Sequence, residues 1–268
     1  MEAFKKPEAS SILFKGDVSN KLKLLFISPL FVSLVLVVTL SISSLFLYEQ
    51  QKISNILVDT KKNANDFYKN SLNYDTQAML AMLAILSKNI ELQKHFVQQD
   101  RHALLTDTKK LMRELSQDFN ITHLYFIKPN KEAFLRTHAP SRYGDKINRV
   151  TLDGAIKNND KSYGIEIGPL GTLTLRVVSP WYNASHHLIG YLELGMEVNS
   201  IIQQLQNFID LNMMVVINKK YLTKSTWIQG LSVLGRFPNW EQFSNLVVNQ
   251  DKSFNLPVEI NQCLTSNS

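Results

Sequence analysis

The sequence from Leu24 to Tyr48 reads LLFISPLFVSLVLVVTLSISSLFLY and contains no charged residue in 25 positions. A helix rises about 1.5 Å per residue, so a helix of this length covers the hydrocarbon core of a bilayer with some tilt. The stretch is apolar on every side, whereas the core helix of a soluble protein normally keeps a polar face. It is also longer than the apolar region of a cleaved signal peptide. We therefore predict a transmembrane helix over residues 24–48.

The residues that precede this helix carry an excess of positive charge. Lysines outnumber acidic residues there: Lys5, Lys6, Lys15, Lys21 and Lys23 stand against Glu2, Glu8 and Asp17. Basic residues next to a transmembrane helix favour the cytoplasmic side. We therefore expect residues 1–23 to form a cytoplasmic tail, loose over residues 1–20, and everything after Tyr48 to face the periplasm of a bacterium, with the helix in the inner membrane.

The composition narrows the classes of partner. About 220 residues follow the predicted helix, which is enough for a sizeable core. The net charge is +6, but no dense run of Lys and Arg occurs beyond the tail, so the charge is interpreted as solvated surface and no nucleic-acid partner is expected. Cys263 is the only cysteine, so the outer part must be stable through packing without an internal disulfide.

The segment from Glu49 to about Leu92 contains no proline or glycine and predicts one long helix. Small, apolar and hydroxyl side chains recur along it with alternating spacings of four and three residues: Ile53, Leu57, Thr60, Ala64, Phe67, Ser71, Tyr74, Ala78, Ala81 and Ile85. Such a seam either pairs with its copy in a homodimer or lies against the chain's own sheet. Residues 78–86 are apolar on more than one side, so Met79 and Met82 are expected in the core. A second amphipathic helix is predicted over residues 101–119.

At Ile121 the pattern changes to that of strands. Residues 121–127 and 132–138, joined by a turn at 128–131, predict a hairpin. A helix is predicted at 150–157, strands at 163–167, 172–179 and 188–197, and a helix at 198–208. Sequential strands with short connections favour an antiparallel sheet flanked by the earlier helices, which is an α+β fold.

After Asp210 a smaller module begins. Residues 213–217 predict a strand, and the apolar residues that follow could form a small core: Trp227, Leu231, Trp240, Phe243, Leu246 and Val247. Only about 55 residues remain, so we expect this module to be incomplete.

Several motifs in the middle of the chain together resemble a known family. They are FLRTHAPSRYGD at 134–145 followed by Arg149, GIEIGPLG at 164–171, LRVVSP at 175–180 and IGYLELG at 189–195. In this order, behind a membrane helix, they resemble the extracytoplasmic Cache sensor domains, most closely the double-Cache type of bacterial histidine kinases, chemoreceptors and diguanylate cyclases.

The resemblance implies a long helix followed by two PAS-like modules. On this basis residues 49–120 form the helical segment, 121–209 the membrane-distal Cache module and 210–268 a partial membrane-proximal one. The family continues with a second membrane helix and a cytoplasmic output domain, and neither is recognisable here. We therefore expect a fragment, a prematurely terminated product or a stand-alone sensor.

Two strands carry charged residues in unusual places. Arg136 and His138 are two residues apart and should share a face of the sheet. Arg176 lies between Leu175 and Val177, where a permanent charge needs a carboxylate or a ligand. The resemblance places a ligand pocket on this sheet beneath loop 138–149, and so implies these lining residues: Arg136, His138, Tyr143, Asp145, Arg149, Arg176 and Trp181.

Converging arginines would favour an anionic small-molecule ligand such as a carboxylate. The alternative is structural: Arg136 or Arg176 pairs with Glu166, Glu193 or Asp145. Asp145, which follows Gly144, also fits a turn or a helix cap.

No motif predicts catalysis or a bound cofactor. His138, His186 and His187 suggest a metal site, but adjacent histidines in a polar turn are usually exposed to solvent, so no metal is expected. No phosphate-binding loop, nucleophile elbow or zinc helix is present. We predict a membrane-anchored periplasmic ligand-binding domain of a bacterial signal-transduction protein. The alternatives are a non-signalling envelope anchor or partner-binding protein, and an enzyme whose site is not recognisable.

Overall fold

The computed structural model describes residues 13–168, 171–211, 213–233, 236, 239–249 and 257–266. Contacts within the chain divide it into two compact units, one ending at Asn63 and the other beginning at Ala64. The first unit contains the amino-terminal part of one long helix. The second contains the rest of that helix, two sheets and the remaining helices.

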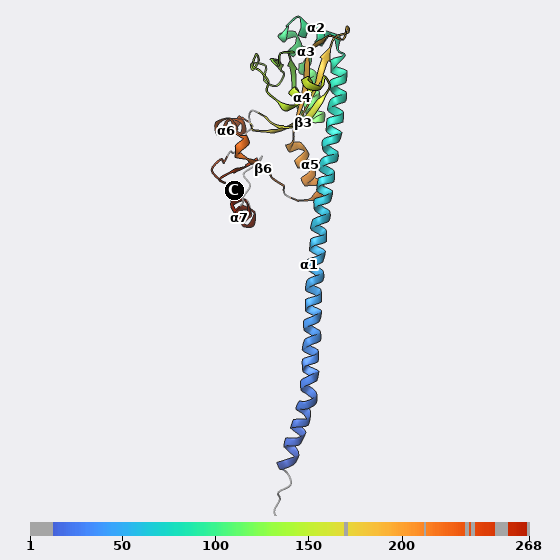
Figure 1. Cartoon of the computed structure of the whole chain (residues 1–268), viewed down its shortest axis with the longest axis vertical. Helices are drawn as coiled ribbons and strands as arrows, with labels where there is room; N and C mark the ends of the chain where they lie inside the picture. The colour runs from blue at the N-terminus through green and yellow to red at the C-terminus, as the bar shows by residue number, and fades with distance from the viewer. Residues whose placement is uncertain are drawn as a thin grey trace, which may run out of the picture. The chain divides into compact units, whose positions relative to one another are not determined.

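Helix α1 spans Leu13–Ser87 without interruption, although Pro29 lies inside it (Figure 1). Among the described residues, it is the one helix long and apolar enough to cross a membrane. Its apolar side chains between 25 and 48 are exposed, as expected of a helix that faces lipid. Residues 13–23, predicted as part of the tail, belong to α1 because a helix, once nucleated, gains one hydrogen bond for each residue added. Residues 1–12 lie outside the described part of the chain.

The long helix ends at Ser87, five residues earlier than predicted. Helix α2 (Ile90–Val97) then begins, and Asn89 accepts hydrogen bonds from the backbone N–H groups of Glu91 and Leu92. Asparagine is one of the residues preferred at the capping position of a helix, which explains why a new helix begins here. Helix α3 (Arg101–Phe119) follows as predicted.

A five-stranded antiparallel sheet forms the centre of the second unit, and it confirms the predicted α+β fold. Its strands are β1 (Ile121–Ile127), β2 (Ala133–Arg136), β3 (Ser162–Ile167), β4 (Leu173–Tyr182) and β5 (Leu188–Glu197). The spatial order is β2-β1-β5-β4-β3, so β5 lies between β1 and β4. The predicted helix at 150–157 is α4 (Val150–Asn158).

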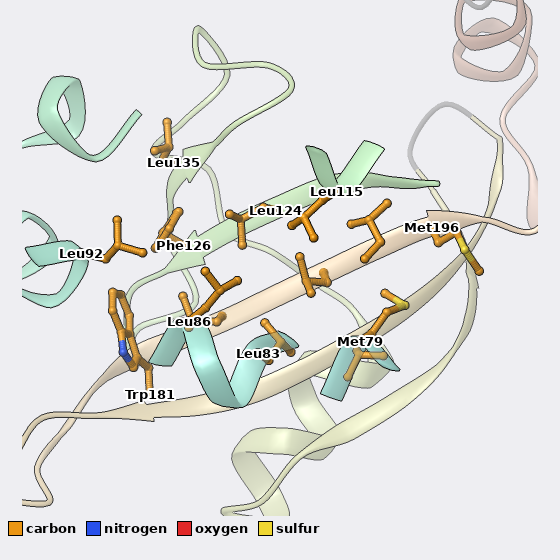
Figure 2. Close-up of a cluster of buried hydrophobic side chains, with 14 of the residues drawn as sticks. Met79, Leu83, Leu86, Leu92, Leu115, Leu124, Phe126, Leu135, Trp181 and Met196 are labelled. Carbon is orange, nitrogen blue, oxygen red and sulfur yellow. The ribbon is translucent and has the colours of Figure 1, made fainter. Parts of the chain in front are cut away.

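Different helices cover the two faces of this sheet. On one face α1, α2 and α3 build the larger core, in which Met79 and Leu83 of α1 belong to the same buried cluster as Leu124 and Phe126 of β1 (Figure 2). On the other face, α4 packs over a smaller cluster that includes Tyr125. This division follows from the strand geometry, because successive side chains point to opposite faces.

The most deeply buried residues of α1 are not those of the predicted seam. Tyr74 and Ile85 of the seam are 76% and 73% exposed, whereas Met79 and Leu83 are 1% exposed. The buried residues of α1 also recur at spacings of three and four residues, but they start at a neighbouring position of the helix. The structure therefore contradicts packing of the exposed seam residues against the chain's own sheet, and pairing with a second copy stays a prediction.

Helix α5 (Asn199–Ile209) follows β5, and its Ile201 is buried in the larger core. The elements after it are β6 (Val215–Asn218), the 3-10 helix η1 (Lys219–Tyr221), α6 (Lys224–Val233), β7 (Leu246–Asn249) and α7 (Val258–Ser266). Strands β6 and β7 pair antiparallel. The predicted small core exists: Trp227, Leu231 and Val247 are buried together, with Trp240 packed against them.

Candidate ligand-binding site

Glu193 in β5 is the centre of a buried charged cluster on the α4 face of the large sheet. Its side chain is fully buried, and its Oε1 atom accepts hydrogen bonds from two arginines. Arg176 of β4 donates from Nη1 at 2.6 Å, and Arg149, immediately before α4, donates from its own Nη1. Arg149 also donates from Nη2 to the Tyr125 hydroxyl at 3.2 Å. A permanently charged arginine is tolerated inside the sheet because this carboxylate balances it.

The strand register explains why these side chains meet. Glu193 lies opposite Tyr125 of β1 and Val178 of β4, and Arg176 is two residues before Val178. Residues two apart on a strand share a face, and diagonal neighbours on adjacent strands are within reach of long side chains.

Glu166 of β3 connects the cluster to α4. Its Oε1 atom accepts a hydrogen bond of 2.6 Å from the backbone N–H of Thr151, in the first turn of the helix. Its Oε2 atom lies 3.9 Å from Arg176 Nε. Glu166 thus satisfies a free N–H group of α4, a group that the capping position Arg149 leaves without a side-chain partner.

Arg136 and Asp145 form the second ion pair of this face. The guanidinium of Arg136 binds both carboxylate oxygens, with Nη1–Oδ1 at 2.6 Å and Nη2–Oδ2 at 2.8 Å, and Nη1 also donates to the carbonyl of Arg142. This bidentate bond lowers the pKa of the Asp145 carboxyl. Arg136 is buried, whereas the Asp145 side chain is 58% exposed. The pair therefore joins the buried strand to the surface loop.

Aromatic rings and two histidines complete the surroundings. The Tyr125 ring lies 4.7 Å from the Arg149 guanidinium and 5.4 Å from that of Arg136. The rings of His123 and His138 meet edge to face at 4.3 Å. Burial, reinforced by nearby positive groups that include Arg176, lowers the pKa of His123 to about 2 and that of His138 to about 4. Both imidazoles are neutral at pH 7, and the arginines supply the positive charge.

Four buried polar atoms on this face have no hydrogen-bond partner among the described residues. They are Glu193 Oε2, Arg176 Nε, Thr151 Oγ1 and Thr174 Oγ1. Native proteins satisfy nearly all buried polar atoms, so such a group indicates a place where water or a ligand binds. The four atoms offer both an acceptor and donors to a visiting molecule.

Five of the seven residues predicted for the site meet on this face, as ion pairs or ring contacts. Arg136, His138 and Arg149 each contact Tyr125, Arg176 binds Glu193, and Asp145 binds Arg136. Arg136 and His138 share a face, as their spacing predicts. The structural alternative also holds, because Arg136 forms an ion pair with Asp145 and Arg176 forms one with Glu193.

Tyr143 and Trp181 lie elsewhere. Tyr143 is exposed, with the Arg101 guanidinium 3.5 Å from its ring centroid. Trp181 is buried in the core on the opposite face, where Nε1 donates to the Ser87 carbonyl. The structure therefore does not bring Trp181 to the predicted pocket.

Sequence reasoning missed Tyr125, although it faces Arg136 directly across the hairpin. The predicted hairpin places the strand of Tyr125 beside the strand of Arg136, and this pattern could have identified Tyr125 as a residue of the site. Among the described residues, no three His, Cys, Asp or Glu side chains are grouped so that they could hold a metal ion.

A family described as the double sensory domain of two-component sensor kinases (dCache_3) matches residues 60–232, which is more than half of the chain. The chain belongs to this double-Cache family, as the motifs predicted. No curated protein matches the sequence.

Three solved structures show partial similarity to this chain. The sensor domain of DcuS from Escherichia coli is 18% identical, with a TM-score of 0.44, covering 50% of this chain and 97% of that one. The periplasmic domain of LuxQ from Vibrio cholerae is 14% identical, with a TM-score of 0.46 and coverages of 74% and 82%. The sensor domain of the V. cholerae histidine kinase DctB is 16% identical, with a TM-score of 0.39 and coverages of 59% and 64%. The family assignment rests on the sequence match.

Proposed function

We propose that the larger module is a periplasmic sensor that binds a small molecule beneath α4. The observation that carries this proposal is that two buried atoms at the centre of the face, Glu193 Oε2 and Arg176 Nε, have no hydrogen-bond partner among the described residues. A buried charge left partly unsatisfied is costly, and a ligand that supplies a donor to Glu193 and an acceptor to Arg176 would recover that cost. The proposed role is sensing and not catalysis.

The charges on this face suggest how an anionic ligand would enter. Three arginines are balanced by three carboxylates: Arg136, Arg149 and Arg176 against Asp145, Glu166 and Glu193. A ligand carboxylate therefore has to replace one of these partners. Asp145 is the exposed one, on a surface loop, and its bidentate bond to Arg136 has the geometry that a ligand carboxylate would adopt. We propose that an acidic ligand displaces Asp145 from Arg136.

The helix α1 is proposed to anchor this module in the bacterial inner membrane with the amino terminus in the cytoplasm. The excess of lysines before residue 24 supports this orientation. A ligand that binds the α4 face with different affinity in two arrangements of the sheet would shift the population of those arrangements. Trp181, at the end of β4, would transmit the change to α1 through the Ser87 carbonyl.

The exposed part of the α1 seam that includes Ile53, Leu57 and Ile85 is proposed to pair with a second copy. Ile85 is exposed at the carboxyl end of this seam, so a cysteine there should not disturb the sheet. In a Cys263→Ser chain, Ile85→Cys should give a disulfide-linked dimer on mild oxidation. A cysteine at Lys110, an exposed α3 residue outside the seam, should not; equal cross-linking at both positions would refute the seam as the interface.

Thermal unfolding of the full chain in lipid nanodiscs, with a panel of carboxylic acids and amino acids, tests the sensor proposal. A ligand at a hundred times its dissociation constant should add about 2.7 kcal/mol to the free energy of unfolding. Asp145→Asn should tighten binding because it removes the internal competitor, and Arg136→Gln should abolish it. The matched control is Asp153→Asn, which alters a surface pair with Lys131.

Failure of the whole panel to stabilise the chain, together with capture of another envelope protein, would favour the anchor or partner-binding alternative. Equal ligand affinity in Arg136→Gln and the unchanged chain would place the ligand away from Arg136.

A further inference from the structure

A pocket of about 550 Å³ lies on the other face of the large sheet, away from the charged cluster. It is lined by α1, the carboxyl end of α3, the start of β1, the end of β5 and Gln204 of α5. Its volume is within the range of pockets that hold small molecules. Met79 and Met196, which line it, lie at the same end of the buried cluster (Figure 2).

The walls of this pocket combine aromatic rings with flexible thioethers. Phe67 and Tyr74 of α1 and Phe119 of α3 contribute rings, and Met79, Met82 and Met196 contribute sulfur-containing side chains. Methionine adapts its shape to a ligand, and an aromatic face attracts a cation. Although Met79 and Met82 were expected purely as core residues, both also border this pocket.

The charged residues that line the pocket are all acidic. Asp75 and Asp118 line it, and no lysine or arginine is among its lining residues. Within the described part of the chain, neither carboxylate has an ion pair or a side-chain hydrogen bond. Burial raises the pKa of the Asp75 carboxyl, as expected when water is removed and nothing replaces it. A cation would satisfy these carboxylates.

We propose that this pocket is a second binding site, specific for an organic ammonium ion with an apolar body. The ammonium group binds Asp75, Asp118 supplies the second carboxylate of the lining, and the apolar body lies among the rings and methionines. The site goes beyond the proposed sensor function, because it is on the opposite face and selects the opposite charge. Since α1 and the sheet both line it, an occupant would contact both.

Three probes with the same ring and different charges test the proposal: benzylammonium, benzyl alcohol and benzoate. The full chain, labelled with ¹³C-methyl methionine in nanodiscs, reports binding, because three of its seven methionines line the pocket. Benzylammonium should shift the methyl signals of Met79, Met82 and Met196 and leave those of Met213 and Met214 in place. Its dissociation constant should be at least ten times lower than that of benzyl alcohol, and benzoate should be the weakest of the three.

Asp75→Asn should reduce the affinity for benzylammonium to that for the alcohol. Asp66→Asn is the matched control, since Asp66 is an exposed acidic residue on the same helix outside the lining, and it should change the affinity less than twofold. If circular dichroism shows that Asp75→Asn is unfolded, Asp118→Asn replaces it, with an expected loss of at least threefold.

Equal affinity for the three probes, or unchanged benzylammonium binding in both pocket variants, would overturn the proposal. So would methionine signals that respond to protein dilution and not to benzylammonium, because a second copy of the chain would then occupy the pocket. Arg136→Gln, which tests the site beneath α4, should leave benzylammonium binding unchanged, so the two proposals can fail independently.

Discussion

Glu193 is a fully buried carboxylate on the α4 face that binds both Arg149 and Arg176. Both arginine side chains are largely buried, and taking charges out of water costs several kcal/mol per ion unless partners replace the water. Glu193→Gln would leave Arg149 and Arg176 facing each other. We predict a loss of about 3–5 kcal/mol in the free energy of unfolding, measured by chemical denaturation. Asp145→Asn, at the exposed end of the other ion pair, should cost about 1 kcal/mol or less, and comparable losses would contradict the central role of Glu193.

The two neutral histidines predict how stability depends on pH. Their folded pKa values, about 2 for His123 and about 4 for His138, lie below the ordinary value near 6.5. The unfolded chain therefore binds more protons between about pH 4 and 6.5, so stability rises with pH through this window and is fully present above it. Denaturation midpoints at pH 5 and pH 7 should differ, and His123→Gln should reduce the difference. His187→Gln, at an exposed position, should not.

Residue-level prediction succeeded where strand alternation decides the outcome. Arg176 between two apolar neighbours needed a buried partner, and Glu193 supplies it. The same alternation could have excluded Trp181, because it is five residues after Arg176 on the same strand and so points to the opposite face. Tyr143 could not be placed in this way, since it lies in a loop where no repeating geometry fixes the direction of a side chain.

At the scale of elements, a hydrogen bond to the carbonyl group of Ser87 joins the last residue of α1 to the end of β4. Ser87 O accepts hydrogen bonds from Trp181 Nε1 at 2.9 Å and from Gln93 Nε2 at 2.6 Å. The last carbonyls of a helix have no partner within the helix, so these donors stabilise its end. Their loss would loosen the proposed connection between the sheet and α1.

Trp181→Phe keeps a buried ring but removes the donor. We predict a loss of about 1–3 kcal/mol, because the smaller ring also leaves a space in the core, and faster hydrogen exchange in the last turn of α1. Tyr182→Phe is the control: it removes an exposed hydrogen bond to Asn159 and should leave exchange in α1 unchanged. Exchange that is equally slow in both variants would show that the Trp181 bond does not hold the helix end.

The elements themselves were largely predictable, and their exact packing was not. Changes of period located the hairpin, α4, and strands β3 to β5. The spatial order, with β5 inserted between β1 and β4, depends on contacts between distant segments that a local pattern does not encode. For α1 the predicted spacing of buried residues is correct, but the stripe that is buried contains Met79 and Leu83 and lies beside the predicted one. The sequence does not distinguish the two stripes, because both are apolar.

At the scale of the whole molecule, an apolar helix and a sensor module belong to one chain with +6 net charge. The orientation of that chain decides which solutes the site beneath α4 and the pocket beside α1 can meet. Hydropathy identifies the membrane helix without tertiary structure, and the lysines before it predict the direction.

The single cysteine makes the predicted orientation directly measurable. Cys263 is exposed and is the only cysteine of the chain, so a membrane-impermeant maleimide should label the unmodified protein in intact spheroplasts. In a Cys263→Ser chain carrying Ser10→Cys, labelling should appear only after lysis, because the basic tail stays on the cytoplasmic side. A Cys263→Ser chain without the added cysteine controls for background labelling. The reverse pattern, with the tail labelled in intact spheroplasts and Cys263 only after lysis, would place the sensor module in the cytoplasm and remove periplasmic solutes as its ligands.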